Sequence, residues 1–155
     1  MNYPAENNNF LDGHAALLSN SYRRLFAKEL ILESEAHGML AKALFYAPFV
    51  VVSHTTNPDP VFNYANLKAL ELFGFSWEEF TQLPSRLSAE PIHQLEREKL
   101  LAEVSRKGYI DDYKGVRLTK VGQRFLIKNA VVWNLLDSDG CYAGQAARFE
   151  GWEFL

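Results

Sequence analysis

Apolar residues at helical spacing mark the first part of the chain. The stripe begins after Asp12 and comprises four main positions widened by two neighbours: Leu18, Tyr22, Leu25 and Leu32, with Leu17 and Phe26. Asp12 is expected to cap this helix, and the Asn-rich residues 1–11 before it are expected to form a loose arm. Gly38 interrupts the pattern, and a second short helix is expected over residues 39–46.

The apolar face of this N-terminal helix has two interpretations. It covers part of the core of its own chain, or it is a dimerising face that packs on another subunit. Both arrangements bury the stripe, so the pattern leaves the alternatives open.

Two short strands are expected next. Residues 49–53 follow Pro48 and are rich in valine, which is typical of a strand bounded by turn residues. The segment Asn57-Pro-Asp-Pro60 forces a turn, because each proline restricts its own backbone and that of the preceding residue. Residues 61–64 are then expected to form a second strand.

The junctions of the following two helices carry specific signals. Asn66 is placed to cap a helix, and Gly74 is placed to end it in the left-handed conformation. The segment Ser76–Glu79 then makes a capping box, with Phe75 and Phe80 positioned as a hydrophobic staple. Two consecutive short helices are therefore predicted.

A longer helix and three strands complete the chain. Pro91 suits the first turn of a helix that runs to about Lys107 and ends at Gly108, and its apolar positions are Ile92, Leu95, Leu100, Leu101 and Val104. Glu103 is placed to form an ion pair with Lys107. Strands are expected over residues 110–119, 123–136 and 142–149, with a hairpin turn at Asp137-Ser-Asp-Gly140.

Alternation in the middle of these strands predicts one shared apolar face: Phe125, Ile127, Val131, Trp133 and Leu135, with Asn129 among them. The order of elements predicts an α+β fold, a five-stranded antiparallel sheet with helices on one side and an N-terminal helical extension. We divide the chain into an N-terminal arm with helices, residues 1–47, and a sheet-containing domain, residues 48–155.

Several segments of the second part resemble a known family. Tyr64-Ala-Asn66, Leu70-Glu-Leu-Phe-Gly74 and Ser76-Trp-Glu-Glu79, in this element order, look like a PAS domain. The closer similarity is to the MEKHLA domain, a PAS-like family, and four segments carry it: Asp59-Pro-Val-Phe-Asn-Tyr-Ala-Asn66, Leu83-Pro-Ser-Arg-Leu-Ser-Ala-Glu-Pro91, Val132-Trp-Asn-Leu135 and Gly144-Gln-Ala-Ala147. The resemblance covers residues 48 to 152 and implies sensing or protein interaction.

Composition excludes several other classes of function. The net charge of -3 argues against a nucleic-acid partner. The single cysteine, Cys141, forms no internal disulfide and suits a reducing compartment. The N-terminus lacks the basic and apolar blocks of a signal peptide, and no apolar run approaches the roughly 20 residues of a membrane helix. We therefore expect a cytoplasmic protein without membrane contact.

Two amides are candidates for a ligand site between sheet and helices. Gln145 lies between Ala143 and Ala147 on one face of the last strand, where small residues leave room beside a polar group. Asn129 interrupts an apolar row in the neighbouring strand. Either both amides bind a small molecule, or each ties down a loop or backbone group. A register shift of one residue would turn Gln145 to the opposite face.

The resemblance to PAS domains allows cofactors to be tested residue by residue. Light-sensing flavin domains carry an Asn-Cys-Arg-Phe core whose cysteine bonds to flavin, and Ser85 stands at that place, which excludes adduct chemistry. Gln145 resembles the final-strand glutamine that contacts the flavin ring, whereas Arg117 and Lys128 fall near the places of the ring-binding asparagines. Flavin remains a candidate. Haem is disfavoured, because His93 is a lone histidine at a helix start.

The expected ligand-binding set is completed by three further residues. Arg86 suits a bidentate contact to an anion, or braces its loop against Glu78, Glu79 or Glu90, and we favour the bracing role. Trp133 and Tyr64 lie in the family-like segments and join Gln145, Asn129, Ser85 and Arg86 in the set.

The function expected from these observations is a PAS-like sensory or regulatory module that binds a small ligand or a protein partner without catalysis. A homodimer or a separate effector protein is the expected partner. The alternative is a pure interaction module without ligand. An isomerase-like enzyme is the third hypothesis, with Asp112 or Asp59 acting beside His54. No metal site is expected, because His14, His37, His54 and His93 are scattered along the chain.

Overall fold

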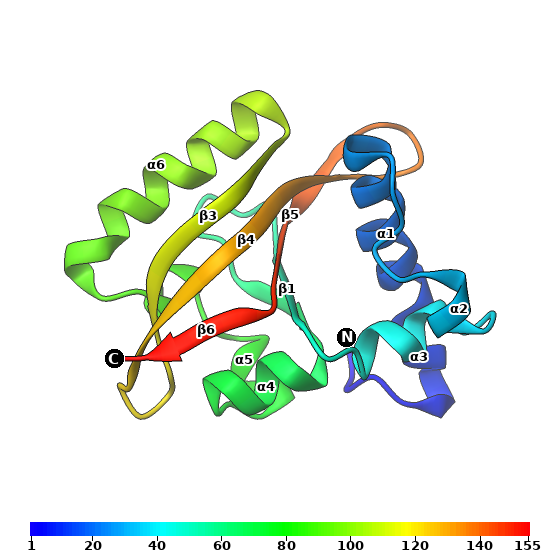
Figure 1. The fold of residues 1–155 in the computed structure, drawn as a ribbon, viewed down its shortest axis with the longest axis horizontal. Helices are drawn as coiled ribbons and strands as arrows, with labels where there is room; N and C mark the ends of the chain where they lie inside the picture. Colours follow the sequence, from blue (N-terminus) through cyan, green and yellow to red (C-terminus); the bar gives the residue numbers. More distant parts are fainter.

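The centre of the computed structural model, which describes residues 1–155, is an antiparallel sheet with helices on both faces (Figure 1). The strands run in the order β2-β1-β5-β4-β3, and a sixth strand pairs with β4. Their bounds are β1 Val50–His54, β2 Phe62–Ala65, β3 Tyr109–Leu118, β4 Arg124–Leu136, β5 Tyr142–Phe149 and β6 Gly151–Phe154. The five predicted strands are present. The predicted total of five is one too low, because β6 continues beyond β5 along the first part of β4.

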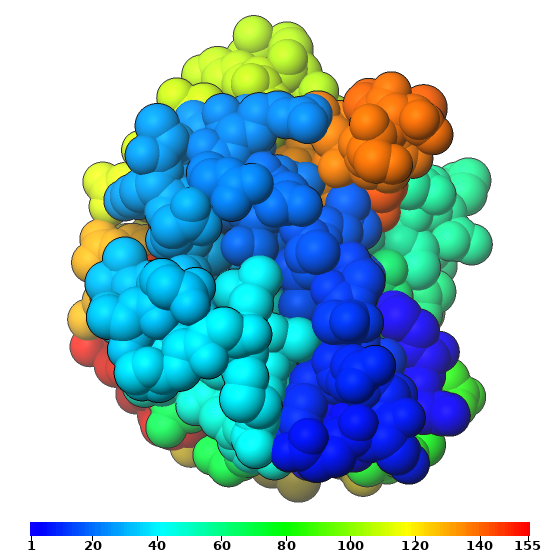
Figure 2. Space-filling model, turned by 90° about the vertical axis from the view of Figure 1, so that its right-hand side faces the viewer, coloured from blue at the N-terminus to red at the C-terminus, as the bar shows by residue number.

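Two helical layers cover the sheet. The inner face, as we name the face that carries Val52, Val132 and Ala147, is covered by the second group of helices: α4 Leu67–Phe73, α5 Trp77–Phe80, the 3-10 helix η2 Ser85–Ser88 and α6 Pro91–Lys107. The outer face carries Val51 and Trp133 and is covered by the N-terminal elements: η1 Glu6–Leu11, α1 Asp12–Phe26, α2 Glu33–Ala36 and α3 Leu40–Phe45. Figure 2 shows residues 1–47, in blue to cyan, spread over this side of the molecule.

The predicted helix junctions are confirmed. The Asn66 side chain accepts a hydrogen bond from the Ala69 amide at 3.2 Å, and Gly74 ends α4 with φ +80°. The capping box of Ser76–Glu79 is formed in both directions. The rings of Phe75 and Phe80 lie 5.9 Å apart, as a staple requires. These signals act within one turn of helix, so they are readable without knowledge of the tertiary fold.

The N-terminal region differs from its prediction in three respects. Asp12 is the first helical residue rather than the cap, which is Leu11 in the left-handed conformation. α1 ends at Phe26, so Leu32 lies outside the stripe and is 55% exposed. Residues 1–11 are packed rather than loose: Phe10 is buried, and the carbonyl of Met1 accepts a hydrogen bond from the indole of Trp77 at 3.0 Å.

The middle of β4 contains a reversal that the alternation pattern missed. Asn129 has φ +52° and lies in a bulge between the pairing with β6 and the pairing with β5. A bulge inserts one residue and turns every later side chain to the other face. The predicted single face is therefore wrong: it splits into Phe125 and Ile127 on the inner face, and Val131, Trp133 and Leu135 on the outer face.

The long helix α6 follows its predicted pattern only in its second half. Leu100 and Val104 are buried against the sheet, whereas Ile92 and Leu95 are 81% and 61% exposed. The first turns of α6 therefore lie beyond the sheet, and Arg97 is the first residue of α6 to be buried. The predicted ion pair of Glu103 with Lys107 is confirmed, with Nζ 2.8 Å from Oε1.

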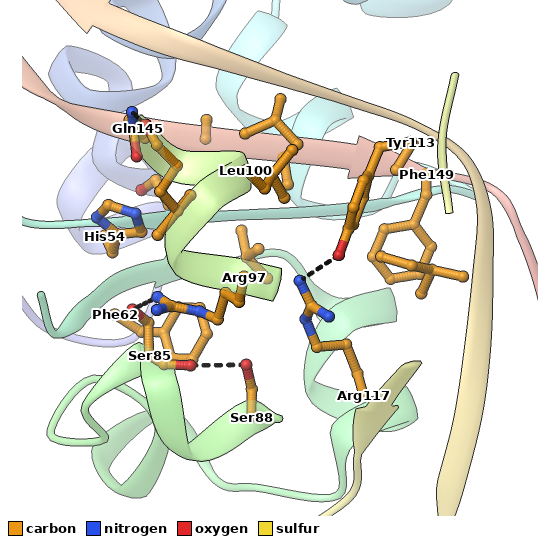
Figure 3. Close-up of a pocket in the computed structure, with 18 of the residues that line it drawn as sticks. His54, Phe62, Ser85, Ser88, Arg97, Leu100, Tyr113, Arg117, Gln145 and Phe149 are labelled. Atoms are coloured by element: carbon orange, nitrogen blue, oxygen red, sulfur yellow. Dashed lines mark hydrogen bonds between the residues drawn. The ribbon is translucent and has the colours of Figure 1, made fainter. Parts of the chain in front are cut away.

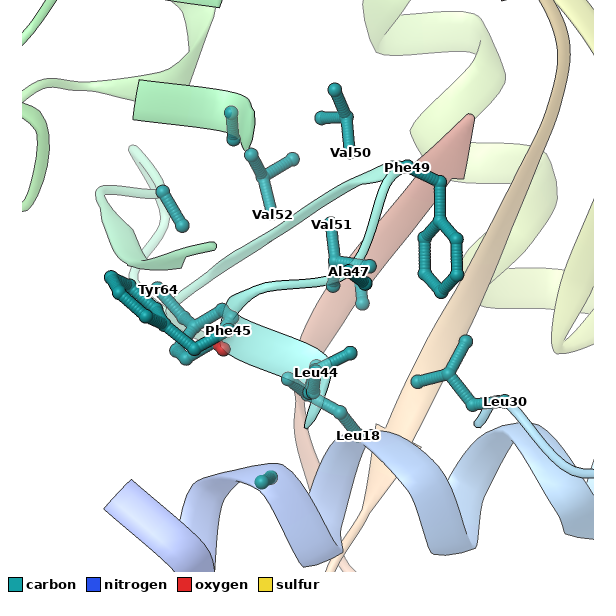
Figure 4. Close-up of a cluster of buried hydrophobic side chains, with 14 of the residues drawn as sticks. Leu18, Leu30, Leu44, Phe45, Ala47, Phe49, Val50, Val51, Val52 and Tyr64 are labelled. Atoms are coloured by element: carbon teal, nitrogen blue, oxygen red, sulfur yellow. The ribbon is translucent and has the colours of Figure 1, made fainter. Parts of the chain in front are cut away.

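One hydrophobic core of 30 buried residues unites the N-terminal layer with the sheet. Figure 4 shows Leu18 and Leu44 packed towards Val51. The apolar stripe of α1 is thus buried within its own chain, which confirms the first of the two interpretations of this helix. Residues 1–47 and 48–155 contribute to this same core.

Candidate functional site

A cavity of about 70 Å³ lies between the inner face of the sheet, η2 and α6. Its wall is mainly apolar and includes Phe62, Leu100, Ile127, Val132 and Phe149. The polar residues on the wall are three serines, one histidine, one glutamine, one tyrosine and two arginines (Figure 3). No carboxylate lines it. The cavity is therefore an apolar space with a basic edge.

The register of three strands brings polar side chains together at one end of the cavity. His54 on β1 pairs with Gln145 on β5, which pairs with Asn134 on β4. The amide nitrogen of Gln145 donates to Asn134 Oδ1 at 3.0 Å and to the Leu101 carbonyl of α6 at 3.2 Å. These bonds tie α6 to the sheet, so the amide nitrogen of Gln145 has a structural role at the cavity wall.

His54 presents an unused acceptor beside this network. Its Nδ1 lies 3.0 Å from the Thr55 carbonyl, and because a carbonyl can only accept, Nδ1 carries the proton. Nε2 is then an acceptor, and it is buried with no hydrogen bond of normal geometry, although the side chain of Gln145 lies close enough to act on the pKa of the ring. Burial lowers the pKa of His54, which keeps the ring neutral. An unpaired buried acceptor costs roughly 1–3 kcal/mol, so a donor from a bound molecule would be stabilising here.

The local backbone at this end of the sheet depends on Gly144. Its φ is +123°, and a Cβ at this position would overlap the carbonyl oxygen of His54. Only glycine permits so close an approach of the two strands. The glycine thus sets the distance between β1 and β5 where His54 and Gln145 face the cavity.

Arg97 is the buried charge of the site. Its residue exposure is 6%, and Nη2 donates a hydrogen bond to Ser85 Oγ. The ion pairs of the protein include no partner for Arg97 within 4.0 Å. Burial, and then the nearby charge of Arg117, lower the pKa of Arg97 to about 10, so the side chain remains protonated at neutral pH.

Arg117 on β3 supplies the second guanidinium. Its Nη2 donates to the Tyr113 hydroxyl at 3.2 Å, and its Nη1 donates to the Val116 carbonyl at 2.8 Å. Gly115 lies between Tyr113 and Arg117 on the same face of β3, and a Cβ there would overlap the Tyr113 ring. The missing side chain lets the tyrosine lie along the strand and hold Arg117 towards the cavity.

Two of the predicted ligand-binding residues lie on the cavity wall, and that they bind a ligand remains a prediction. Ser85 is 1% exposed and bonded to Arg97, and Gln145 is 2% exposed. Arg86 lies outside the cavity and pairs with Asp59, with Nε 3.2 Å from Oδ1. The favoured bracing role of Arg86 fits this geometry, but the expected glutamate partners were wrong.

The remaining three members of the predicted set lie elsewhere. Asn129 is exposed at the bulge of β4, because its left-handed backbone turns it out of the apolar row. Trp133 and Tyr64 point to the outer face: the indole bonds to the Leu18 carbonyl at 3.3 Å, and the Tyr64 ring stacks on His14 at 5.4 Å. The expectation that these residues meet Gln145 in one cavity is therefore wrong.

The residues of the enzyme and cofactor hypotheses are also separated from the cavity. Asp112 is exposed on β3, and Asp59 pairs with Arg86, so neither carboxylate shares the cavity wall with His54. His93 lies near Glu96, outside the wall. A cavity of about 150 Å³ binds benzene, so a cavity of about 70 Å³ does not accept the three-ring system of a flavin, or a haem, as it stands.

Arg97 was missed in the sequence, although a signal for it exists. It precedes Leu100 by three positions and Val104 by seven, which places it on the buried stripe of α6. An arginine on an apolar stripe is the kind of buried charge that needs a partner. From the sequence, Arg117 was noted only because it falls near the place of an asparagine that binds the flavin ring in light-sensing PAS domains.

A sheet closed on one face by two short helices and one long helix, with a cavity between them, is the architecture of a PAS domain. The PAS domain of a protein from Colwellia psychrerythraea matches with a TM-score of 0.62 and 16% identity, over 74% of this chain and 92% of that chain. A light-oxygen-voltage domain studied with a flavin analogue matches with a TM-score of 0.59 and 19% identity, over 75% and 84% of the two chains. The light-state dimer of the fungal blue-light photoreceptor Vivid matches with a TM-score of 0.54 and 16% identity, over 66% of this chain and 76% of that chain. At these identities the similarity shows the fold.

Within this class, the chain belongs to the MEKHLA domain family, whose model matches residues 12–154. The match begins at the first residue of α1, so the family includes the helical cover of the outer face. No curated protein matches the sequence. None of the helices has the length and apolarity that crossing a bilayer requires.

Proposed function

We propose that this protein is a sensory module that binds a small molecule in the cavity and reports it through association with another protein or a second copy of itself. The PAS-like fold supports the sensory class. The observation that carries the ligand is the buried Nε2 atom of His54, a residue of the cavity wall, which has no hydrogen-bond partner within the protein.

A route from the cavity to the surface runs through β5. Gln145 faces the cavity, and the next residue, Ala146, faces the layer formed by α1. α1 is held to the sheet by the Trp133 indole and by Ser21, whose hydroxyl accepts from the Leu136 amide at 3.0 Å. A small shift of β5 on ligand binding would change the packing of α1 and the surface that a partner meets.

Association is the proposed output. A structure of similar fold, Vivid, is described as a light-state dimer, and a homodimer or an effector complex is the corresponding proposal for this chain. We place the protein in the cytoplasm, in keeping with its exposed free Cys141. Neither nucleic acid nor membrane enters the proposal.

A pure interaction module is the second candidate. The small volume of the cavity and the use of the Gln145 nitrogen in tying α6 to the sheet favour this alternative. In that case the cavity holds only water, and the outer layer acts without a ligand.

Native mass spectrometry of the purified protein, compared with its denatured mass, separates the two candidates. A retained small molecule supports the sensory proposal, and an absorption spectrum identifies a coloured one. Ala147→Leu fills the cavity from its wall, whereas Ala43→Leu changes a partly buried alanine of the N-terminal layer and serves as the control. The first variant is expected to lose the bound molecule and the second to keep it. If neither the parent protein nor a metabolite library shows binding, the interaction module is the better description.

A further inference from the structure

We infer that the cavity selects a small organic carboxylate with an apolar body, whose carboxylate is held by Arg97 and Arg117. This inference rests on the proposed ligand-binding function and names the chemical class of the ligand. It is carried by two guanidinium groups that share an apolar cavity without an acidic partner.

The first step concerns Arg97, whose charge has no ion-pair partner within 4.0 Å and is attracted only from a greater distance by Glu98 and Asp59. A buried charge is normally paired, because its transfer out of water is costly. Arg97 has one hydrogen bond, to a serine hydroxyl, and at least three of its five N–H groups have no acceptor within the protein. Arg97 lines the cavity, and in Figure 3 its guanidinium lies beside Ser85 and Phe62. The side chain is therefore placed to bind an oxyanion that the protein itself does not supply.

The second step concerns the position of Arg117. Both residues line the cavity, and in Figure 3 the guanidinium of Arg117 points towards Tyr113 while that of Arg97 points towards Ser85. Two like charges in an apolar cavity repel each other, and an anion between them converts this repulsion into two attractions. Arg117 is held in place by Tyr113 rather than by a carboxylate, so its charge is also available to a ligand.

The third step concerns the type of anion. Arg117 is only partly buried, and water compensates part of its charge, whereas Arg97 is almost fully buried. One buried positive charge is neutralised by a monoanion. A planar carboxylate matches the donor fork of a guanidinium, and the apolar wall disfavours a doubly charged phosphate.

The fourth step concerns the rest of the ligand. Leu100, Val132 and Ile127 provide an apolar wall that suits a short hydrocarbon body. In Figure 3 His54 and Gln145 lie at the end of the cavity opposite Arg117. The free acceptor on His54 Nε2 matches a hydroxyl of the ligand at this end. A short hydroxycarboxylate combines these features, and because the cavity measures only about 70 Å³, its wall must move outward to accept even this ligand.

The test measures binding of butyrate, 3-hydroxybutyrate, the neutral isostere butyramide and inorganic phosphate by NMR titration of the full chain. Shifts of the Nε–Hε signals of Arg97 and Arg117 report the site directly. We expect butyrate to bind at least tenfold more tightly than butyramide, and 3-hydroxybutyrate to bind more tightly than butyrate. Phosphate is expected to bind more weakly than either carboxylate.

Arg97→Met is the decisive variant, and Arg86→Met is its control, because Arg86 lies outside the cavity and pairs with Asp59. Arg97→Met is expected to weaken carboxylate binding roughly 10- to 100-fold, and the control to leave it unchanged. Removing an unpaired buried charge should also raise the Tm of the ligand-free protein by about 3 °C. If Arg97 merely braced Ser85, the Tm would fall instead. Arg97→Lys, which keeps the charge without the planar fork, should bind with intermediate affinity.

Three results would overturn the inference: butyramide binding as tightly as butyrate, unchanged affinity in Arg97→Met, or tighter binding of phosphate than of the carboxylates. The first two results would overturn the carboxylate assignment, but the proposed ligand-binding function would still stand. If no probe shifts the cavity signals while native mass spectrometry reveals a retained neutral compound, the carboxylate assignment alone is wrong. If neither experiment detects a ligand, the proposed sensory function fails as well.

Discussion

The indole nitrogen of Trp133 on β4 donates a hydrogen bond of 3.3 Å to the backbone carbonyl of Leu18 on α1, which lies 115 residues away in the sequence. This contact fastens the N-terminal layer to the outer face of the sheet. Tyr22 packs edge-on against the same indole, with ring centroids 5.1 Å apart. The outer layer is therefore part of the folded unit and not an appendage.

Trp133→Phe removes this hydrogen bond and part of the ring. We expect the free energy of unfolding to fall by about 1–3 kcal/mol, because the Leu18 carbonyl is left unpaired beside a small void. The amides of α1 should exchange with solvent faster, as measured by hydrogen exchange. Trp152→Phe changes a partly exposed indole on β6 and is the control. Equal protection of α1 in the two variants would contradict the tethering role.

Gly144→Ala tests the close approach of β5 to β1. The added Cβ would overlap the His54 carbonyl oxygen, and φ is +123°, so overlap and backbone strain act together. We expect a loss of roughly 2–4 kcal/mol in urea unfolding. Gly140→Ala is the matched control, because Gly140 has φ +80° but open space around it, and should cost only about 1 kcal/mol. Similar losses in both variants would show that the close approach has no effect of its own.

Asn66→Ala tests a fully satisfied buried amide. Its Oδ1 accepts from the amides of Val51 and Ala69, and its Nδ2 donates to the carbonyls of Leu44 and Phe49. One side chain thus joins α3, β1 and α4, and its removal leaves four buried groups to be paired otherwise. We expect a loss of about 3–5 kcal/mol by chemical denaturation.

The control for this variant is Asn20→Ala, which removes an exposed amide that bonds only to Arg23. Its stability should change by less than about 0.5 kcal/mol. An Asn66→Ala protein as stable as this control would show that water replaces the four bonds without cost.

The pH dependence of stability should reflect His14. The His14 ring stacks on Tyr64, and its Nε2 lies 2.9 Å from Ser53 Oγ. Burial in this position lowers the pKa of His14 to about 4. The unfolded chain takes up a proton near pH 6.5 and the folded one only near pH 4, so stability falls as the pH drops between these values. The expected loss is about 2–3 kcal/mol, measured by urea unfolding at pH 7 and pH 4.5.

His14→Gln should reduce this slope without removing it. The pKa of His54 is also lowered by burial, and its contribution has the same sign. Glu79 is separate, because Lys120 holds its pKa at about 2, and the stability it contributes is lost only below its ordinary value of 4.5. An unchanged slope in the variant would assign the effect to groups other than His14.

The sequence predicted the elements of the fold well wherever their ends depend on local chemistry. The cap at Asn66, the left-handed Gly74 and the proline that starts α6 act through their own neighbours, so reading them needs no tertiary information. The antiparallel sheet with its first five strands followed from the PAS-like succession of elements. The sixth strand did not, because its pairing with β4 is a long-range contact.

The candidate site was predicted only in part, for two physical reasons. The bulge at Asn129 cannot be recognised from the sequence. Asparagine adopts the left-handed conformation more readily than most residues, but most asparagines in proteins do not adopt it. Val131, Trp133 and Leu135, which follow Asn129 on β4, were therefore assigned to the wrong face. The buried charge of Arg97 was missed for the second reason: charged residues on a helix normally face water, whereas Arg97 on α6 is buried.

The two indoles buried against the N-terminal region make this protein its own optical reporter. Trp77 bonds to the Met1 carbonyl, and Trp133 bonds to that of Leu18, so each ring monitors a different section of the cover. Fluorescence emission shifts to longer wavelength when an indole is hydrated. Detachment of the first residues and displacement of α1 can thus be followed separately in real time, with single-tryptophan variants and no attached dye.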